Sequence, residues 1–276
     1  MNRMRSIVTL FVGCAMAAGA RADAPVFDVR AHGAVGAVNP LHTAAINTAI
    51  ETCAKTGGGQ VIVPPGTYLT GTVRLRSHIT LVLSDGAVLA GTNDLSQYQS
   101  FAPPESKSGA SSNWHRAVVL GDGVEDVAIV GRGVIDGRRV PDPDGEEHMR
   151  GPHGILLGNC RGVTIRDITI RDAANYAVMM ELTSQVEVRG IKVTGGWDGV
   201  HFRGRKGKPC RDVSIIDCEF YTGDDCIAGG YWERTLIDRC TINSSCNGIR
   251  LIAPAKDLIV HDCLFFGPGR FEHRTS

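Results

Sequence analysis

The sequence predicts an all-β fold, a parallel β-helix built from a single chain. Short β-rich cores recur in its second half, with matched positions 22, 23 or 27 residues apart. Such a period, with several strands in each unit, is typical of solenoids that stack coil upon coil. Glycine accounts for 34 of 276 residues and aromatic residues for only 6%, which suits short strands joined by tight turns. The matched cores are Val186-Glu187-Val188, Val213-Ser214-Ile215, Thr235-Leu236-Ile237 and Leu258-Ile259-Val260.

A leucine-rich repeat has a similar period and is the competing fold. Its L-x-x-L-x-L spacing and its asparagine ladder are both missing from this sequence. The parallel β-helix is therefore the predicted fold.

The first 22 residues read as a secretory signal. Arg3 and Arg5 form a charged region, Ile7 begins an apolar run, and Ala20-Arg21-Ala22 fits an A-x-A cleavage site. The apolar run is shorter than the roughly 20 residues that a membrane span needs. We therefore expect a signal peptide at 1–22, one domain at 23–276 and a secreted protein, extracellular or periplasmic.

The balance of charge argues against several partners. Lys+Arg and Asp+Glu each number 29, so no overall field attracts nucleic acid or an anionic membrane. We expect a monomer without a membrane span.

The one convincing helical pattern lies near the N-terminus. Residues 43–54 place Ile46, Ala49, Ile50 and Cys53 on one face, and three glycines follow at 57–59. An amphipathic helix in front of a solenoid can cover its first coil, which would otherwise expose apolar side chains and unpaired backbone groups. A short capping helix is therefore predicted.

Short strands follow from Gln60 onward, interrupted by two polar, Pro-rich insertions at 94–116 and 138–153. We expect these insertions to project as loops over one face.

Removal of Cys14 with the signal leaves eight cysteines. Cys218, Cys240 and Cys263 each fall three residues after a matched core position, so stacked coils would space them by about 4.8 Å. Disulfides prefer a Cβ separation nearer 3.8 Å, and zinc-type C-x-x-C spacing is missing. We expect a buried ladder of free thiols and no metal site.

A column of polar residues follows the same register. Ten residues after Val188, Ile215 and Ile237 stand Asp198, Asp225 and Asn247. Together with Asp224, the column brings three carboxyls into one patch. Crowded carboxyls repel one another and separate in pKa, which acid/base cleavage of a glycosidic bond requires.

With these residues in place, the chain resembles the polygalacturonase family, glycoside hydrolase family 28, among the pectin-lyase-like right-handed β-helices. The resemblance covers most of residues 55–250. It is carried by Gly57-Gly58-Gly59-Gln60-Val61-Ile62-Val63-Pro64-Pro65-Gly66-Thr67-Tyr68, by Gly131-Arg132-Gly133-Val134-Ile135-Asp136-Gly137 and by Gly223-Asp224-Asp225-Cys226-Ile227. It implies a right-handed helix and a hydrolase without a cofactor, active in pectin degradation and cell-wall organisation.

The resemblance also implies a catalytic role for each of the three aspartates. Gly196-Trp197-Asp198 stands where the family has Asn-Thr-Asp, and the Asp-Asp pair is Asp224-Asp225. Asp224 would protonate the glycosidic oxygen, while Asp198 and Asp225 would deprotonate water. This would be an inverting hydrolysis with roughly 6.5–9.5 Å between acid and base. A raised pKa is expected for Asp224 because other carboxyls lie beside it.

Two family motifs are altered. Ser245-Cys246-Asn247-Gly248 stands where Gly-His-Gly is expected, and Arg-x-Lys, which binds the substrate carboxylate, has no clean match. Arg270-Phe271-Glu272 puts an acid where the Lys belongs.

Four other residues are candidates for binding the polysaccharide or oligosaccharide substrate. His201 and Arg250 follow Asp198 and Asn247 by three residues and share a column with Ala228, so both can point into the cleft. Asn247 can hydrogen-bond there, and Trp197 offers a ring for sugar stacking. The alternatives are a solvated Arg250, a structural His201 and a Trp197 that merely covers the sheet.

The sequence stops at Ser276, soon after the core at 258–260, without a recognisable cap. We expect a C-terminally incomplete domain; the alternative is that Gly267 to Ser276 folds back as a cap.

The predicted function is therefore a secreted glycosidase acting on a pectic or related acidic polysaccharide. Two rivals stay open. One is a polysaccharide lyase in which the Asp residues hold Ca²⁺, and the other is a non-catalytic β-helix that binds carbohydrate.

Overall fold

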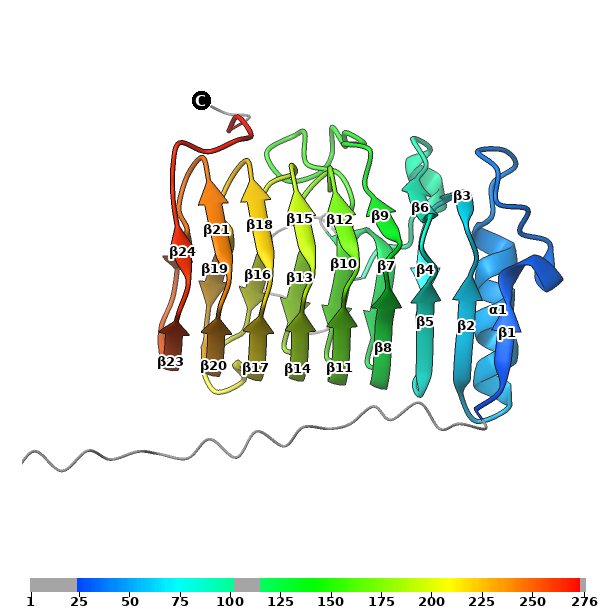
Figure 1. The fold of residues 1–276 in the computed structure, drawn as a ribbon, viewed down its shortest axis with the longest axis horizontal. Helices are drawn as coiled ribbons and strands as arrows, with labels where there is room; N and C mark the ends of the chain where they lie inside the picture. The colour runs from blue at the N-terminus through cyan, green and yellow to red at the C-terminus, as the bar shows by residue number, and fades with distance from the viewer. Residues whose placement is uncertain (1–23, 102–114, 274–276) are drawn as a thin grey trace, which may run out of the picture.

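The computed structural model describes residues 24–101 and 115–273. The signal predicted at 1–22 lies outside these residues, as does most of the insertion predicted at 94–116. The described chain winds into a parallel β-solenoid (Figure 1). Each full coil contributes one strand to each of three sheets, which we call sheets A, B and C, and every pair of neighbouring strands in them is parallel. The predicted all-β fold is confirmed.

The strands follow one another in the order A, B, C around each coil. Sheet A contains β1 (Val26–Asp28), β2 (Gly59–Val63), β5 (Ile79–Leu83), β8 (Glu125–Gly131), β11 (Arg161–Arg166), β14 (Ser184–Arg189), β17 (Cys210–Ile216), β20 (Trp232–Asp238) and β23 (Ala255–His261). Sheet B contains β3 (Gly66–Thr70), β6 (Ala87–Gly91), β9 (Val134–Asp136), β12 (Thr169–Arg171), β15 (Lys192–Thr194), β18 (Glu219–Thr222), β21 (Thr241–Ser244) and β24 (Leu264–Phe265). Sheet C contains β4 (Val73–Arg74), β7 (Ala117–Asp122), β10 (His153–Gly158), β13 (Val178–Glu181), β16 (Val200–Arg203), β19 (Ile227–Gly230) and β22 (Ile249–Leu251).

The predicted capping helix is confirmed as α1 (Thr43–Lys55), at the end of the solenoid that carries β1 (Figure 1). It buries the predicted face of Ile46, Ala49, Ile50 and Cys53 against the first coils. Two short 3-10 helices, η1 (Val29–His32) and η2 (Leu95–Gln97), complete the regular structure. In the described part of the chain no helix is both long enough and apolar enough to cross a bilayer.

The core lies inside the three sheets, where side chains from successive coils stack in columns. Within one such stack the backbone N–H of Cys240 donates to Sγ of Cys263 at 3.4 Å, and Sγ of Cys218 donates to the carbonyl of Ile216 at 3.1 Å. All eight cysteines from Cys53 onward are free thiols. The predicted thiol ladder, without disulfides, is confirmed.

The turns after two sheet C strands, β10 and β13, hold a left-handed residue at matched positions: Asn159 has φ 52° and Leu182, one coil further, has φ 51°. Leucine tolerates this conformation less well than asparagine. We therefore expect Leu182→Asn to raise the free energy of unfolding by about 0.5 kcal/mol, after loss of some apolar burial. Thermal denaturation checks this, with Asn159→Leu as the matched variant of opposite sign. A lower melting temperature for Leu182→Asn would contradict the expectation.

The last coil leaves apolar side chains exposed. Val260 is 42% exposed and Phe265 is 49% exposed, although their counterparts one coil earlier, Ile237 and Ile242, are buried. The segment after β24 instead runs beside β21, where Nδ2 of Asn243 donates to the carbonyl of Pro268 at 2.9 Å. In the described residues, the alternative of a C-terminal cap over the last coil is therefore not realised.

Candidate active site

The turns between sheets B and C build the predicted polar column. Register places Tyr176, Asp198, Asp225 and Asn247 at one position of four successive coils. The backbone bonds that hold them in line run from Gly199 N–H to the Asp225 carbonyl (3.0 Å) and from Cys226 N–H to the Asn247 carbonyl (3.0 Å). The ten-residue offset that predicted this column is therefore realised.

The backbone explains one departure from the family motif. Gly196 has φ 75° and a Cβ there would lie 2.9 Å from the carbonyl oxygen of Ala173. Asparagine and glycine are the residues that most readily adopt such a left-handed conformation. Glycine at position 196 therefore fits a tight turn in front of Asp198, where the Cβ of an asparagine would press on the Ala173 carbonyl.

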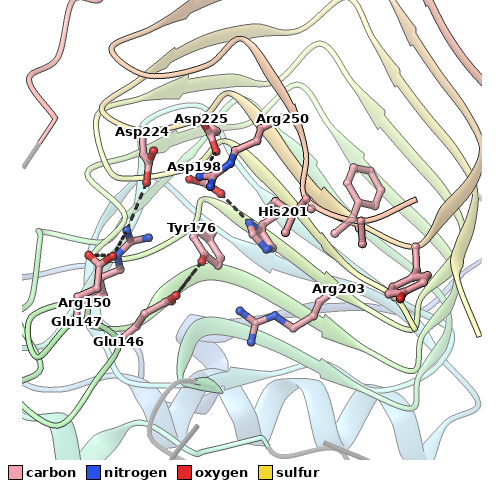
Figure 2. Close-up of a pocket in the computed structure, with 17 residues that line it drawn as sticks. Glu146, Glu147, Arg150, Tyr176, Asp198, His201, Arg203, Asp224, Asp225 and Arg250 are labelled. Carbon is pink, nitrogen blue, oxygen red and sulfur yellow. Dashed lines mark hydrogen bonds and ion pairs between the residues drawn. The ribbon is translucent and has the colours of Figure 1, made fainter. Parts of the chain in front are cut away.

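The three carboxyls meet at one edge of a pocket (Figure 2). Asp198, Asp224 and Asp225 are 3%, 7% and 1% exposed, and one oxygen of each lies within 4.8 Å of the others. This spacing is narrower than the roughly 6.5–9.5 Å expected from an inverting pair. A water molecule that makes two hydrogen bonds of about 2.8 Å can bridge oxygens at this separation.

Asp198 carries the raised pKa. Burial is the main cause, and the negative charges of Asp224 and Asp225 add to it, so its pKa lies well above the ordinary value. Nδ1 of His201 lies 2.7 Å from Oδ2 of Asp198. Burial lowers the pKa of His201 to about 3, so the partner of Asp198 is a neutral imidazole.

His201 lies where its column predicted, in the wall of the pocket. Its ring stacks on Tyr176 with centroids 4.2 Å apart and planes nearly parallel. This stacking fixes the imidazole of His201 beside Asp198 and leaves one edge of the imidazole facing the pocket.

Asp225 is surrounded by hydrogen-bond donors. The backbone N–H and Nδ2 of Asn247 donate to its Oδ1 at 3.1 and 2.7 Å, and Arg250 Nη1 lies 3.5 Å from its Oδ2. Asn247 thus donates to Asp225 through both its backbone and its side chain, and its role as a substrate ligand stays a prediction. Arg250 does line the pocket, with its side chain 53% exposed, so it can also reach a substrate.

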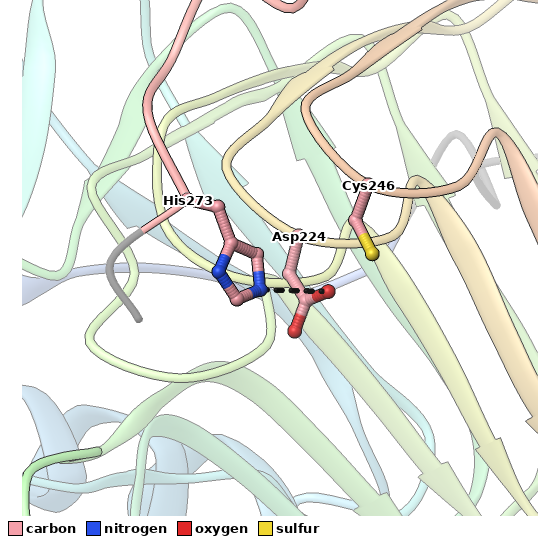
Figure 3. Close-up of side chains that lie close together, drawn as sticks. All are labelled: Asp224, Cys246 and His273. Carbon is pink, nitrogen blue, oxygen red and sulfur yellow. Dashed lines mark ion pairs between the residues drawn. The ribbon is translucent and has the colours of Figure 1, made fainter. Parts of the chain in front are cut away.

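Asp224 has two basic neighbours. Nη2 of Arg150 lies 3.3 Å from its Oδ2, and Nε2 of His273 lies 3.4 Å from its Oδ1 (Figure 3). The exposed thiol of Cys246 stands beside the same carboxyl. Burial and the nearby Asp225 and Asp224 raise the pKa of that thiol to about 11, so it is protonated at neutral pH.

Trp197 is not a sugar platform. Its side chain is 1% exposed, and the guanidinium carbon of Arg150 lies 3.7 Å from its ring centroid. The ring of His273 meets it edge-on. The prediction that Trp197 binds substrate is therefore wrong: both neighbours cover the ring, and Trp197 supports Arg150 instead.

The pocket has a volume of about 390 Å³ and lies on the outer face of sheet C. Its wall includes residues that the sequence reasoning missed, namely Glu146, Glu147 and Arg150 from the insertion and Arg203 from β16. The insertion has no periodicity that could place its side chains. The sequence could have placed Arg203 in the pocket wall. It lies two residues after His201 on the same strand, so both side chains point to the same face of the sheet.

The insertion around Glu146 closes one end of this face. Glu146 accepts hydrogen bonds from Tyr176 Oη and from Asn175 Nδ2, each at 3.2 Å. Along the column of His201 and Arg250, the earlier residues Met179 and Leu156 belong to a buried apolar cluster on the outer face. Sheet C is thus covered over the earlier coils and open at β16 to β22, which confirms that the second insertion projects over one face.

Two groups of possible metal ligands occur here among the described residues. The Asp trio is one, and Asp224 with Cys246 and His273 is the other. In both groups the side chains already have protein partners such as Arg150, Arg250 and His201. We assign no metal to either group.

Comparison with known proteins agrees with this architecture. The family model described as "Right handed beta helix region" matches residues 153–268. A "Probable polygalacturonase" from Vitis vinifera is 30% identical over 207 residues, covering 71% of this chain and 42% of the relative. An exo-poly-alpha-D-galacturonosidase from Dickeya chrysanthemi is 28% identical, covering 73% and 41%. The chain thus spans less than half the length of these two relatives.

Two solved structures share the fold. An exopolygalacturonase from Thermotoga maritima superposes with a TM-score of 0.71 at 19% identity, covering 87% of this chain and 66% of that one. PfbA, a surface adhesin of Streptococcus pneumoniae, gives the same TM-score at 20% identity, covering 91% and 66%. The fold alone is therefore shared by an enzyme and by an adhesin.

Fold and site together define a right-handed parallel β-helix with an acidic pocket on one outer face. Within that class the chain is polygalacturonase-like, as its sequence motifs predicted.

Proposed function

We propose that this chain is an exported glycoside hydrolase that cleaves a pectic or related acidic polysaccharide through its Asp trio. One observation carries the proposal: adjacent coils deliver three buried carboxyls, with oxygens within 4.8 Å, to the edge of an open pocket. Burying three acids together is costly unless they hold protons in common or share a task. The export signal rests on the sequence of residues 1–22.

The chemistry needs one proton donor and one acceptor. The donor protonates the glycosidic oxygen as its bond to the anomeric carbon breaks. A water molecule held by the other two carboxylates attacks that carbon from the opposite face and gives up a proton to them. The product then has an inverted anomeric centre. The resemblance gives the donor role to Asp224, whereas the raised pKa lies at Asp198.

An acidic sugar suits the cations of the pocket. Arg250 stands at the rim with half of its side chain exposed, and Arg203 lines the opposite wall. A guanidinium can bind a uronate carboxylate through paired hydrogen bonds. Gly229 lies in the wall between them, and a Cβ there would come within 2.0 Å of the Phe202 carbonyl oxygen. We propose Arg250 and His201 as substrate-binding residues.

The closed end of the face favours attack on chain ends. Glu146 and Tyr176 fill the position next to Asp198, where a longer chain would have to continue. A polymer can therefore enter from the side of β22 alone and present its terminal sugar. We propose exo cleavage, releasing one or two sugars at a time.

The test is release of reducing sugar from a panel of pectic polymers and oligosaccharides. The wild-type chain is expected to release mono- or disaccharide, first as the inverted anomer seen by NMR. Asp224→Asn is expected to lower turnover about 10²- to 10⁴-fold, because one of three cooperating carboxyls becomes neutral and cannot titrate. Equal, near-zero release from both proteins would sink the proposal.

The same assay separates the rivals. A Ca²⁺-dependent lyase would give an unsaturated, ultraviolet-absorbing product whose formation stops on chelation. A carbohydrate-binding protein would bind the oligosaccharides without turnover. We retain this second candidate function because the chain shares its fold with a surface adhesin.

A further inference from the structure

Tyr231 lies in the wall of the pocket on the side away from the Asp trio. Asp225 stands shortly before β19 and Tyr231 directly after it, so the two residues mark opposite edges of sheet C, and both line the pocket. Extended chain over that stretch covers about 20 Å, and side chains that point inward from the two edges narrow the distance. A sugar held at the trio therefore lies between the trio and Tyr231.

The backbone of Tyr231 is held in a conformation that tyrosine seldom adopts. Its φ is 53°, in the left-handed region that favours glycine and asparagine over bulky residues. Its N–H donates to the carbonyl of Pro254 and its carbonyl accepts from the N–H of Cys210, both at 2.9 Å. Register places Asn159 and Leu182 at the same turn position of earlier coils. The turn itself therefore requires no tyrosine, and asparagine would fit it with less strain.

The side chain of Tyr231 has no partner that explains its presence in the fold. It is half-buried, and within residues 24–101 and 115–273 it has no hydrogen bond, ion pair or ring contact. The next residue differs: Trp232 is 1% exposed and packs on Phe202 with ring centroids 4.4 Å apart. Residues in strained backbone conformations gather at ligand sites. A partly exposed ring in a pocket wall is thus free to contact a ligand.

The surroundings of this ring suit an acidic sugar. Beside Tyr231 the pocket is lined by Gly229 and Gly230, which have no side chain to fill the space in front of the ring. Arg203 is in register with Gly230 on one neighbouring strand, and Arg250 belongs to the other neighbouring strand. A uronate unit offers its carboxylate to a guanidinium and its C–H face to an aromatic ring. Both partners are present in this part of the pocket.

We propose that Tyr231 is a specificity-determining residue, the aromatic surface against which the sugar at the Asp trio packs. The choice of a galacturonate as that sugar rests on the proposed hydrolase function, whereas the contact between ring and sugar does not. Tyr231 provides the accessible ring that buried Trp197 cannot provide. It acts on binding rather than on proton transfer, because it lies at the edge of sheet C opposite the trio.

The experiment is a calorimetric titration with trigalacturonic acid of the Asp224→Asn chain, in which hydrolysis is suppressed. Adding Tyr231→Asn is expected to raise Kd about 5- to 20-fold, because the ring contact is lost. Its melting temperature should stay the same or rise, since asparagine suits φ 53° better than tyrosine does. Adding Tyr231→Phe keeps the ring and should leave Kd within about twofold. In the catalytically intact chain, Tyr231→Asn should raise KM more than it lowers kcat.

Leu182→Asn is the matched control, because it makes the same change at the same turn position, two coils earlier and outside the pocket. It should leave Kd unchanged. The inference is wrong if Tyr231→Asn binds as tightly as its parent, if Tyr231→Phe loses as much affinity as Tyr231→Asn, or if trigalacturonic acid binds none of these chains. Binding that depends on the ring, without turnover of any pectic substrate by the wild-type chain, would instead refute the hydrolase proposal and leave the inference standing.

Discussion

Asp224→Asn is expected to lower kcat on a pectic polymer about 10²- to 10⁴-fold, yet to remain active on an aryl galacturonide with a good leaving group. A sugar leaving group needs a proton as the glycosidic bond breaks, whereas a nitrophenolate leaves without one. Loss of the proton donor therefore lowers kcat on the polymer much more than it lowers kcat on the activated substrate. Measuring kcat for both substrates checks this.

The companion variants make the result decisive. Asp225→Asn should lose activity on both substrates, because its carboxylate is needed to deprotonate water whatever the leaving group is. Asp198→Asn should behave like Asp225→Asn on both substrates if Asp198 acts with Asp225 on the water. If Asp198→Asn is instead the variant rescued by the good leaving group, Asp198 is the donor and the roles that the resemblance implies are contradicted.

Asp198→Asn is also expected to stabilise the fold at neutral pH, by about 1–3 kcal/mol, the usual scale for removing a poorly compensated buried group. The folded pKa of Asp198 is raised above its ordinary value of 3.8, so the folded state binds more protons than the unfolded state between those two pKa values. The free energy of unfolding therefore falls as pH rises from about 3.8 through the folded pKa. The amide introduced by the substitution carries no charge at any pH and removes that decline.

Thermal or urea denaturation of wild type and variant across the acidic and neutral range checks this. The advantage of the variant should be near zero at the lowest pH, grow as pH rises and then level off. Asp212→Asn is the matched control with opposite sign, because the hydrogen bond from Arg234 lowers the pKa of Asp212. A variant that is less stable than wild type at every pH would show that Asp198 is ionised and well paired in the fold.

The column of the site could be read from the sequence because a solenoid repeats its register. Each coil carries a strand core, and a fixed offset of ten residues from that core reached Asp198, Asp225 and Asn247 without any structure. His201 and Arg250 followed from the same rule. Coil lengths varied between 22 and 27 residues, but the variation fell outside these ten-residue stretches.

The rest of the site depends on contacts between residues that the sequence repeat does not relate to one another. Arg150 comes from an insertion and meets Asp224 across 74 positions of the chain, so nothing in its local sequence points to its partner. Trp197 was misjudged because a ring in the active-site motif suggests sugar stacking, whereas in the fold an arginine covers its face. The raised pKa of Asp198 was not predicted, because its main cause, burial, follows from the packing of the fold and not from the neighbouring residues in the sequence.

The exposed apolar side chains at β22 to β24 affect how the pocket loses its structure. Solenoids lose structure from their ends, since each coil is stabilised by its neighbours alone. Asn247 and Arg250 belong to the coil that β22 completes, so local opening of this coil would take the donors away from Asp225 while the central coils stay folded.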